Sequence, residues 1–184
     1  MKYRLEKDSL GEMKVPVNAY YGAQTQRAVE NFQISNLRFS YQFIQSLALI
    51  KKFSAKVNAQ LGLLDKDIAE IIISVAEDII NGDYLSEFVI DIFQTGSGTS
   101  TNMNMNEVIS NIAIEKIGGK KGYKNSVHPN DHVNLGQSSN DVIPTAIHIA
   151  LTKSITFDLI PSLEILANAL QKKSVEFDKR SEER

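Results

Sequence analysis

Apolar positions recur at helical spacing through most of the chain. The clearest run covers residues 40–61, where Phe43 and Leu47 begin a pattern that continues until Gly62. Residues three or four positions apart share one face of an α-helix, and glycine commonly follows a helix end. The pattern therefore predicts a helix that turns one face toward a core.

The same spacing predicts further helices on both sides of this run. One begins after Asp65, whose side chain can cap its first turn, and reaches Ile80 before Asn81-Gly82 ends it. Another covers residues 103–117 and ends at a pair of glycines. A shorter helix is expected over residues 24–32. These segments together indicate a helical domain.

The two ends of the chain differ from this middle region. Residues 140–176 predict one long helix with apolar positions around much of its circumference, which requires neighbours on several sides. Pro161 lacks an N–H donor and is expected to kink or break this helix. Residues 1–18, punctuated by Gly11 and Pro16, predict short extended pieces around turns. The predicted fold class is mainly α, with short extended pieces at the N-terminus.

Composition limits the functions that this fold could serve. The chain has 184 residues, of which 42% are apolar and 23% are charged, as in a soluble globular protein. A net charge of −2 gives no general attraction to nucleic acid or anionic membranes, so any affinity for an anion must be local. The absence of cysteine excludes disulfides, thiolate metal sites and a cysteine nucleophile. No paired-histidine metal motif is present either.

The sequence also predicts where the protein resides. Its first eight residues are too charged for a signal peptide, and no run of about 18 apolar residues could span a bilayer. We therefore expect a cytoplasmic protein that has neither nucleic acid nor a membrane as its partner.

The first candidate for binding chemistry is a glycine-bearing polar segment just ahead of a predicted helix. Ser97, Thr99 and Asn102 offer neutral donors, and Gly98 lets backbone amides approach a ligand without a Cβ in the way. A helix N-terminus adds about 0.3–1 kcal/mol of attraction for an anion when exposed. These features suit a small carboxylate, but the same residues would also serve as ordinary helix caps.

Two later segments have similar chemistry. Ser138, Ser139 and Asn140 precede the last long helix and supply more donors than one cap needs, although capping alone would also explain them. The loop segment His128-Pro129-Asn130-Asp131 could bind a substrate through its imidazole and polar side chains, or could simply order the loop. Each of these segments is ambiguous when taken alone.

Taken together, the segments carry a family resemblance. Residues 96–99, 102–108, 127–131 and 137–142, in this order, resemble the class II fumarate hydratases of the fumarase/aspartase superfamily. Residues 21–27 resemble the same family. Aspartases tend to read Gly-Ala-Gly-Thr and Gln-Ser-Thr-Asn-Asp in the corresponding stretches, so Ser97, His128 and Ser139 favour the fumarase version.

The resemblance implies reversible hydration of fumarate to L-malate in the citric acid cycle, without a metal or organic cofactor. It implies a homotetramer whose active sites are each assembled from three subunits around a bundle of long helices. Residues 1–137 would form the N-terminal lyase domain, and residues 138–184 would begin the central helical bundle. The implied substrate-binding residues are Ser97, Gly98, Thr99, Asn102, Ser138, Ser139 and Asn140, and the implied secondary dicarboxylate site consists of His128, Pro129, Asn130 and Asp131.

The chain also departs from the family pattern. The family's Thr-His-Gln-type segment and its Gly-Ser-Ser-x-Met-Pro-x-Lys-x-Asn loop, which supply the principal acid/base chemistry, are both missing from the 184 residues. We therefore expect no catalytic residue in this chain, and no turnover by the chain in isolation. The charged run 179–184 is unlike the expected continuation. Two alternatives stay open, namely aspartate ammonia-lyase or another superfamily lyase, and a non-catalytic fragment that binds dicarboxylates or other subunits.

Overall fold

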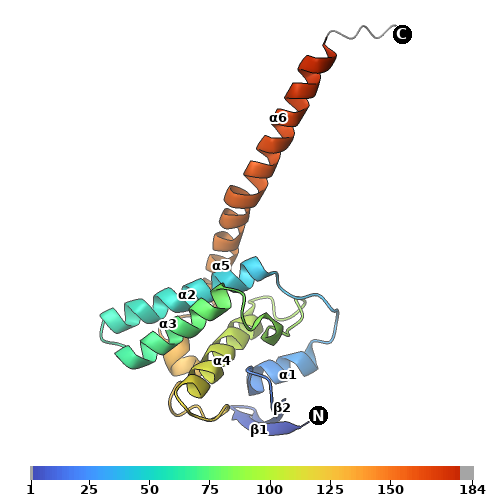
Figure 1. Cartoon of the computed structure of the whole chain (residues 1–184). Coiled ribbons are helices and arrows are strands. Elements are labelled where there is room, and N and C mark those ends of the chain that lie inside the picture. The colour runs from blue at the N-terminus through green and yellow to red at the C-terminus, as the bar shows by residue number, and fades with distance from the viewer. Residues whose placement is uncertain (1, 179–184) are drawn as a thin grey trace.

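The molecule consists of a helical head and a long projecting helix. The computed structural model describes residues 2–178. Helices α1–α4, the first half of α5 and a small β-hairpin form the head, from which the rest of the C-terminal helix extends (Figure 1). The mainly α fold predicted from the sequence is confirmed.

The centre of the head is a packed group of helices. Helix α2 (Tyr41–Gln60) runs beside α3 (Lys66–Ile80), and both pack against α4 (Thr99–Lys116). Each of these helices contributes fully buried side chains to the core, among them Leu47, Ile72 and Ile109. Burying such a side chain contributes about 1.5–3 kcal/mol each. The apolar spacing of the sequence thus selects the faces that form the core.

Capping residues define where two of these helices begin. The Ser40 hydroxyl accepts the Phe43 N–H at the start of α2. At the start of α3, Asp65 Oδ1 accepts the N–H groups of Asp67 and Ile68 at 2.9 and 3.2 Å. The predicted cap at Asp65 is confirmed, and α3 ends at Ile80 as the sequence indicates.

Helix α4 is buried on all sides, and it begins four residues earlier than predicted. All residues from Thr101 to Ile114 are buried, so no amphipathic pattern marks its start. Gly98, with a left-handed φ of 67°, forms the turn before the first residue of the helix. Most buried polar groups in proteins are hydrogen-bonded. Asn104 donates to the Glu87 carbonyl, and Ser110 donates to the Val127 carbonyl.

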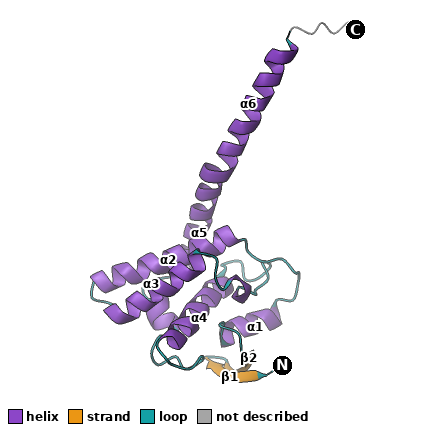
Figure 2. Ribbon diagram, in the orientation of Figure 1, coloured by secondary structure: helices purple, strands orange, loops and turns teal. Residues whose placement is uncertain are grey.

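The N-terminal extended pieces form a hairpin. Strand β1 (Tyr3–Asp8) lies beside β2 (Gly11–Pro16) (Figure 2). The two strands pair antiparallel, with Asp8 opposite Gly11 at the turn. Gly11 has a φ of 121°, a conformation that glycine adopts without steric cost. The predicted short extended pieces are therefore one two-stranded sheet.

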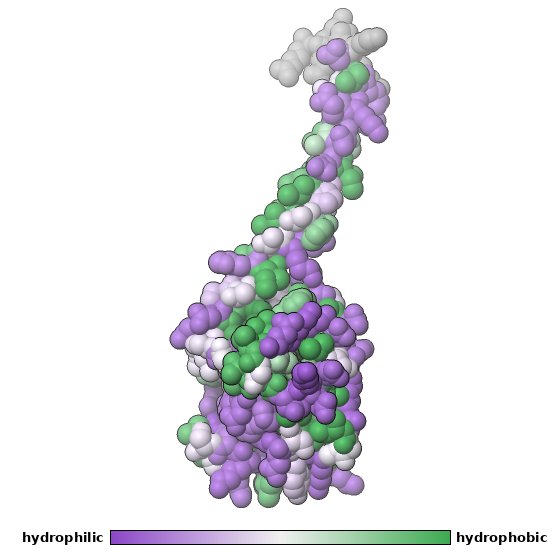
Figure 3. Space-filling view, turned by 90° about the vertical axis from the view of Figure 1, so that its left-hand side faces the viewer, coloured by the Kyte–Doolittle hydropathy of each residue, from purple (hydrophilic) through white to green (hydrophobic). Residues whose placement is uncertain are grey.

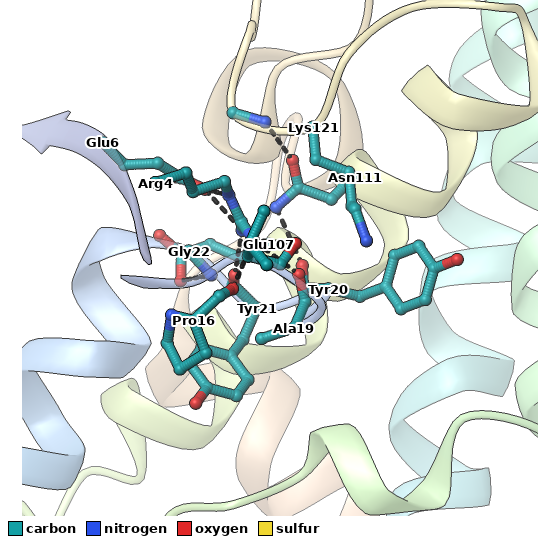
Figure 4. A network of polar contacts seen from close by, with 12 residues as sticks. Arg4, Glu6, Pro16, Ala19, Tyr20, Tyr21, Gly22, Glu107, Asn111 and Lys121 are labelled. Atoms are coloured by element: carbon teal, nitrogen blue, oxygen red, sulfur yellow. Dashed lines mark hydrogen bonds and ion pairs between the residues drawn. The ribbon is translucent and has the colours of Figure 1, made fainter. Parts of the chain in front are cut away.

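A buried carboxylate joins α4 to α1 (Ala23–Asn31). Glu107 accepts the backbone N–H group of Gly22 at 2.9 Å (Figure 4). It also accepts the N–H groups of Gln24 and Thr25 at 3.0 Å, and so caps α1 from another helix. A Cβ on Gly22 would lie 2.8 Å from Glu107 Oε1 and equally close to Glu6. Glycine is needed at position 22 because the two carboxylates approach its backbone so closely.

The C-terminal helix is continuous but not regular. Helix α5 (Ser139–Ser154) passes through a π-helical turn, η3 (Ile155–Leu159), into α6 (Ile160–Phe177). The sequence predicts that Pro161 kinks or breaks the helix. The structure has this wide turn just before the proline, and in it the Ile160 N–H donates to the Ile155 carbonyl. A widened turn relieves the clash between a proline ring and the carbonyl four residues before it. Helix α6 therefore continues beyond Pro161 (Figure 1).

Side-chain burial ends within this helix. Ala146 of α5 is buried against the head, whereas every residue from 155 to 178 is exposed. We call residues 155–178 the rod. Hydrophobic and hydrophilic residues both line the rod (Figure 3). Leu163, Leu166 and Leu170 are all more than half exposed. Among residues 2–178, no helix has both the length and the apolar character to cross a membrane. The domain division after residue 137 stays a prediction.

Candidate functional site

The first turns of α4 and α5 lie against each other. A Cβ on Gly98 would come within 2.9 Å of the Ile143 side chain, so the two helix starts are in close contact. Asn102 Nδ2 donates to Ser139 Oγ at 3.0 Å. Two segments that the sequence presents more than 30 residues apart thus form one surface.

This surface is rich in hydrogen-bond donors. The hydroxyls of Ser97 and Thr99 are exposed and 2.9 Å apart. In the part of the chain that the structure describes, the backbone N–H groups of Thr99, Ser100 and Ser139 have no acceptor. They lie at the positive ends of the two helix dipoles, where an anion is stabilised. The arrangement can hold a carboxylate.

Capping and donor functions coexist at the start of α5. The Ser138 hydroxyl accepts the Asn140 N–H at 3.2 Å, which is the ordinary N-cap contact. The Asn140 side chain is exposed, whereas the Asn102 side chain is buried in the packed part of α4. Capping therefore explains Ser138, and it leaves the Ser139 hydroxyl and the Asn140 amide available.

A buried lysine supports this surface from below. Lys51 of α2 is fully buried, and its Nζ donates to Asn134 Oδ1 and Gln137 Oε1 at 2.9 Å each. Asn102 Nδ2 reaches the same Asn134 oxygen at 3.2 Å. Burial disfavours the charged ammonium and lowers the Lys51 pKa to about 7.

Lys51 is not among the site residues expected from the sequence, although its position in α2 carries a signal. Lys51 stands four residues after Leu47 and four before Ala55, both of which are buried on α2. A charged residue at a core position of an amphipathic helix usually needs a specific buried partner. The partners, Asn134 and Gln137, come from a loop more than 80 residues away, so the pattern of α2 alone could not identify them.

The predicted secondary segment forms a turn of its own. His128 Nδ1 accepts the N–H groups of Asn130 and Asp131 at 3.3 and 3.1 Å, at the start of the π-helical turn η2 (Pro129–Val133). Pro129 is buried, whereas the Asn130 and Asp131 side chains are exposed. In the described chain, the contacts of the His128 side chain stay inside this turn. The turn leads directly into Asn134, but within residues 2–178 no hydrogen bond joins the His128 side chain to Ser97, Thr99 or Ser139.

No metal centre accompanies these groups in residues 2–178, where no three His, Asp or Glu side chains gather closely enough to hold an ion. The candidate site combines neutral hydrogen-bond donors, two helix dipoles and one buried amine. Such a set has the chemistry to bind and orient an anion.

Comparison with known proteins places the chain in a family. A family model described as lyase matches residues 11–180. The chain belongs to this lyase family. It is 53% identical over 176 residues to the class II fumarate hydratase of Halobacterium salinarum, and 52% identical over 176 residues to that of Nitrosomonas europaea. The match covers 96% of this lyase chain but only 37% and 38% of those relatives.

Solved structures agree with the sequence comparison. The lyase chain matches the fumarate lyase:delta crystallin of Brucella melitensis with a TM-score of 0.93 and 43% identity, over 97% of this chain and 42% of that one. The class II fumarase of Schistosoma mansoni gives a TM-score of 0.92 and 42% identity, over 95% of this chain and 37% of that one. The resemblance to class II fumarate hydratases is confirmed, and the chain spans about two fifths of the length of these proteins.

Proposed function

We propose that this chain forms the substrate-binding portion of a class II fumarate hydratase, which reversibly adds water to fumarate to give L-malate in the citric acid cycle. The observation that carries the proposal is the contact between the starts of α4 and α5. It gathers exposed hydroxyls and unpaired backbone N–H groups around the positive ends of two helices. The relatives named above support the reaction class.

The donor set suits the electronic demand of this reaction. Hydration of fumarate passes through a carbanion-like species whose negative charge spreads into the adjacent carboxylate. Donors that bind this carboxylate more strongly as its charge grows lower the barrier. Ser97, Thr99 and Ser139 would supply hydroxyl donors, and Gly98 would leave the backbone open to the ligand. Asn102, Ser138 and Asn140 complete the proposed substrate site.

A secondary dicarboxylate site at residues 128–131 belongs to the same proposal. The buried ring of Pro129 and the His128 cap hold the turn in place, and the side chains of Asn130 and Asp131 are exposed on it. Because Asp131 is acidic, an approaching dicarboxylate would rely on the Asn130 amide and on the histidine. We further propose a homotetramer in the cytoplasm, and the exposed apolar residues of the rod support the oligomer.

A chimera tests the proposed reaction. This chain would replace the corresponding part of the Nitrosomonas europaea relative, which is 52% identical, and fumarate hydration would be measured. We expect turnover by the chimera and none by the 184-residue chain alone. Replacing Thr99 or Asn140 with Ala in the chimera should lower turnover by about tenfold or more while leaving its assembly intact.

The outcomes separate the alternatives. Addition of ammonia rather than water would assign the chain to the ammonia-lyases. An assembled chimera without either activity would contradict the proposed function, and robust turnover by the chain alone would refute the expectation that essential residues lie outside it. Thr152→Ala, on an exposed position of α5 away from the donor set, serves as the matched control and should leave turnover unchanged.

A further inference from the structure

The hydrogen-bond partners of Lys51 fix the direction of a chain of hydrogen bonds that ends at Ser139. Lys51 Nζ donates to Asn134 Oδ1, Asn102 Nδ2 donates to the same oxygen, and Asn102 Nδ2 also donates to Ser139 Oγ. Because an ammonium group has three donors and no acceptor, the amide oxygen of Asn134 must face it.

The surroundings of the two loop amides fix the same direction. Asn134 Nδ2 donates to the Gln137 carbonyl at 3.0 Å, and Gln137 Nε2 donates to the Val133 carbonyl at 3.0 Å. With their N–H groups engaged there, both side chains turn their oxygens toward Lys51. The orientation therefore holds whether Lys51 carries two N–H bonds or three.

This direction of hydrogen bonding leaves one polar atom of Asn102 without a partner. Asn102 Oδ1 is buried and has no hydrogen-bond partner in the described chain. Flipping the amide would let Oδ1 accept the Ser139 hydroxyl, but it would also set Oδ1 against Asn134 Oδ1, and two acceptors repel each other. A buried acceptor without a donor is unfavourable, so its presence here needs a cause. The donors of Lys51, acting through Asn134, supply that cause.

We propose that Lys51 is a positioning residue that makes the Ser139 hydroxyl a donor toward the ligand. Since Ser139 Oγ accepts from Asn102, its own hydrogen is free to point outward to an acceptor. A carboxylate is an acceptor only, and it requires this direction. The inference rests on the proposed function, in which Ser139 contacts a dicarboxylate, and it assigns to Lys51 an effect on that contact from beneath the surface.

Succinate, a dicarboxylate that has no double bond to hydrate, is the probe for the 184-residue chain. Calorimetry would compare the wild type with Lys51→Met, Ser139→Ala and the double variant. Lys51→Met removes every donor while keeping an unbranched side chain. Each single variant should bind succinate on the order of tenfold more weakly, because a hydrogen bond to a charged group is lost. The double variant should bind no more weakly than Ser139→Ala.

Lys52→Met is the matched control, because Lys52 is the next residue of α2 and pairs instead with Glu77 at 2.9 Å. Its succinate affinity should equal that of the wild type. If the effects of Lys51→Met and Ser139→Ala add in the double variant, Lys51 does not act through Ser139, and the inference is overturned.

A second measurement does not depend on succinate binding. The side-chain N–H resonances of Asn102 report its bonds to Asn134 and Ser139. They should shift in Lys51→Met and stay in place in Lys52→Met. If the wild type binds no succinate, the proposed ligand site fails on this chain, yet these resonances still decide the effect of Lys51. Unchanged Asn102 resonances in Lys51→Met would overturn it.

Discussion

At the residue scale, two buried ionisable side chains connect separate elements of the head. Glu107 and Lys51 are each at least 99% buried, and neither forms an ion pair within residues 2–178. Both form hydrogen bonds with neutral groups instead. The carboxylate accepts three backbone N–H groups, and the amine donates to two amide oxygens. Such sites are sensitive to small chemical changes, because a buried group that loses its partner keeps the cost of its desolvation.

Replacing Glu107 with Gln tests the first of these groups. The amide has the size of the carboxylate but turns an NH₂ group toward N–H donors, so part of the cap on α1 is lost. Each buried donor left unpaired costs about 1–3 kcal/mol, and we expect the free energy of unfolding to fall by about 2–4 kcal/mol. Urea denaturation measures this loss. Glu70→Gln, at an exposed position of α3, should change it by less than about 0.5 kcal/mol. Equal effects of the two substitutions would refute the capping role.

Lys51 should make stability depend on pH in a particular direction. Its pKa is about 7 in the folded chain, against 10.5 for the unperturbed side chain. Between these values the unfolded chain binds more protons than the folded chain, so stability rises as the pH increases. From pH 7 to pH 9 the gain should be about 2 kcal/mol, since one pKa unit corresponds to about 1.4 kcal/mol.

Comparison with Lys51→Met isolates this contribution, because other groups titrate equally in both proteins. The wild type should gain stability over the variant when urea denaturation at pH 7 is repeated at pH 9. A stability difference that is the same at both pH values would show that Lys51 keeps its charge when buried.

Some residues of the candidate site belong to local sequence patterns, whereas others depend on partners that are distant in sequence. Ser97, Thr99 and Ser138 could be found from sequence because hydroxyls and glycines before an apolar helical run are a local pattern. The roles of Lys51 and Glu107 could not, because the groups that bond to these two side chains come from segments more than 80 residues away. Local chemistry is visible in a sequence, whereas the burial that gives a charge its role depends on tertiary packing.

At the scale of elements, the start of α4 depends on one glycine. Gly98 has a φ of 67°, and a Cβ there would press within 2.9 Å of Ile143 on α5. Gly96, two residues earlier, has open space around its Cβ position and no positive φ. The two glycines of one motif therefore have different structural requirements.

Alanine at each glycine provides a matched pair. Gly98→Ala should cost about 2–4 kcal/mol, because the left-handed backbone and the contact with Ile143 are both unfavourable. Gly96→Ala should stay within about 0.5 kcal/mol of the wild type. Thermal or urea denaturation compares the two variants, and succinate binding should weaken only for Gly98→Ala. Similar losses at both positions would refute the close contact between α4 and α5.

Element boundaries show the same limit of sequence reasoning. The starts of α2 and α3 could be predicted because Ser40 and Asp65 are local caps before an amphipathic run. The start of α4 could not, because this helix is buried on every side and has no polar face. At Pro161 the sequence predicts a disturbance, but the form that it takes, a wide turn at residues 155–159, depends on how the backbone relaxes.

At the scale of the whole molecule, packing against the head does not stabilise the rod. Residues 155–178 are all exposed, and apolar side chains such as Leu163, Leu166 and Leu170 recur along them at helical spacing. An isolated helix in water is only marginally stable, so most helical stability in proteins comes from packing of an apolar face. The rod therefore favours a packed assembly, as the proposed tetramer provides.

Polar substitutions on the rod should separate assembly from folding. Leu163→Ser and Leu170→Ser lie two helical turns apart on one face, and each removes an apolar side chain that burial would stabilise by about 1.5–3 kcal/mol. In sedimentation velocity, we expect the wild-type chain to form a tetramer and the double variant to dissociate to monomers at the same concentration. The melting of the head should remain, because neither residue contacts its core. Glu164→Gln, between them in sequence, should leave the tetramer intact. A wild-type chain that sediments as a monomer at every concentration would contradict the proposed assembly through the rod.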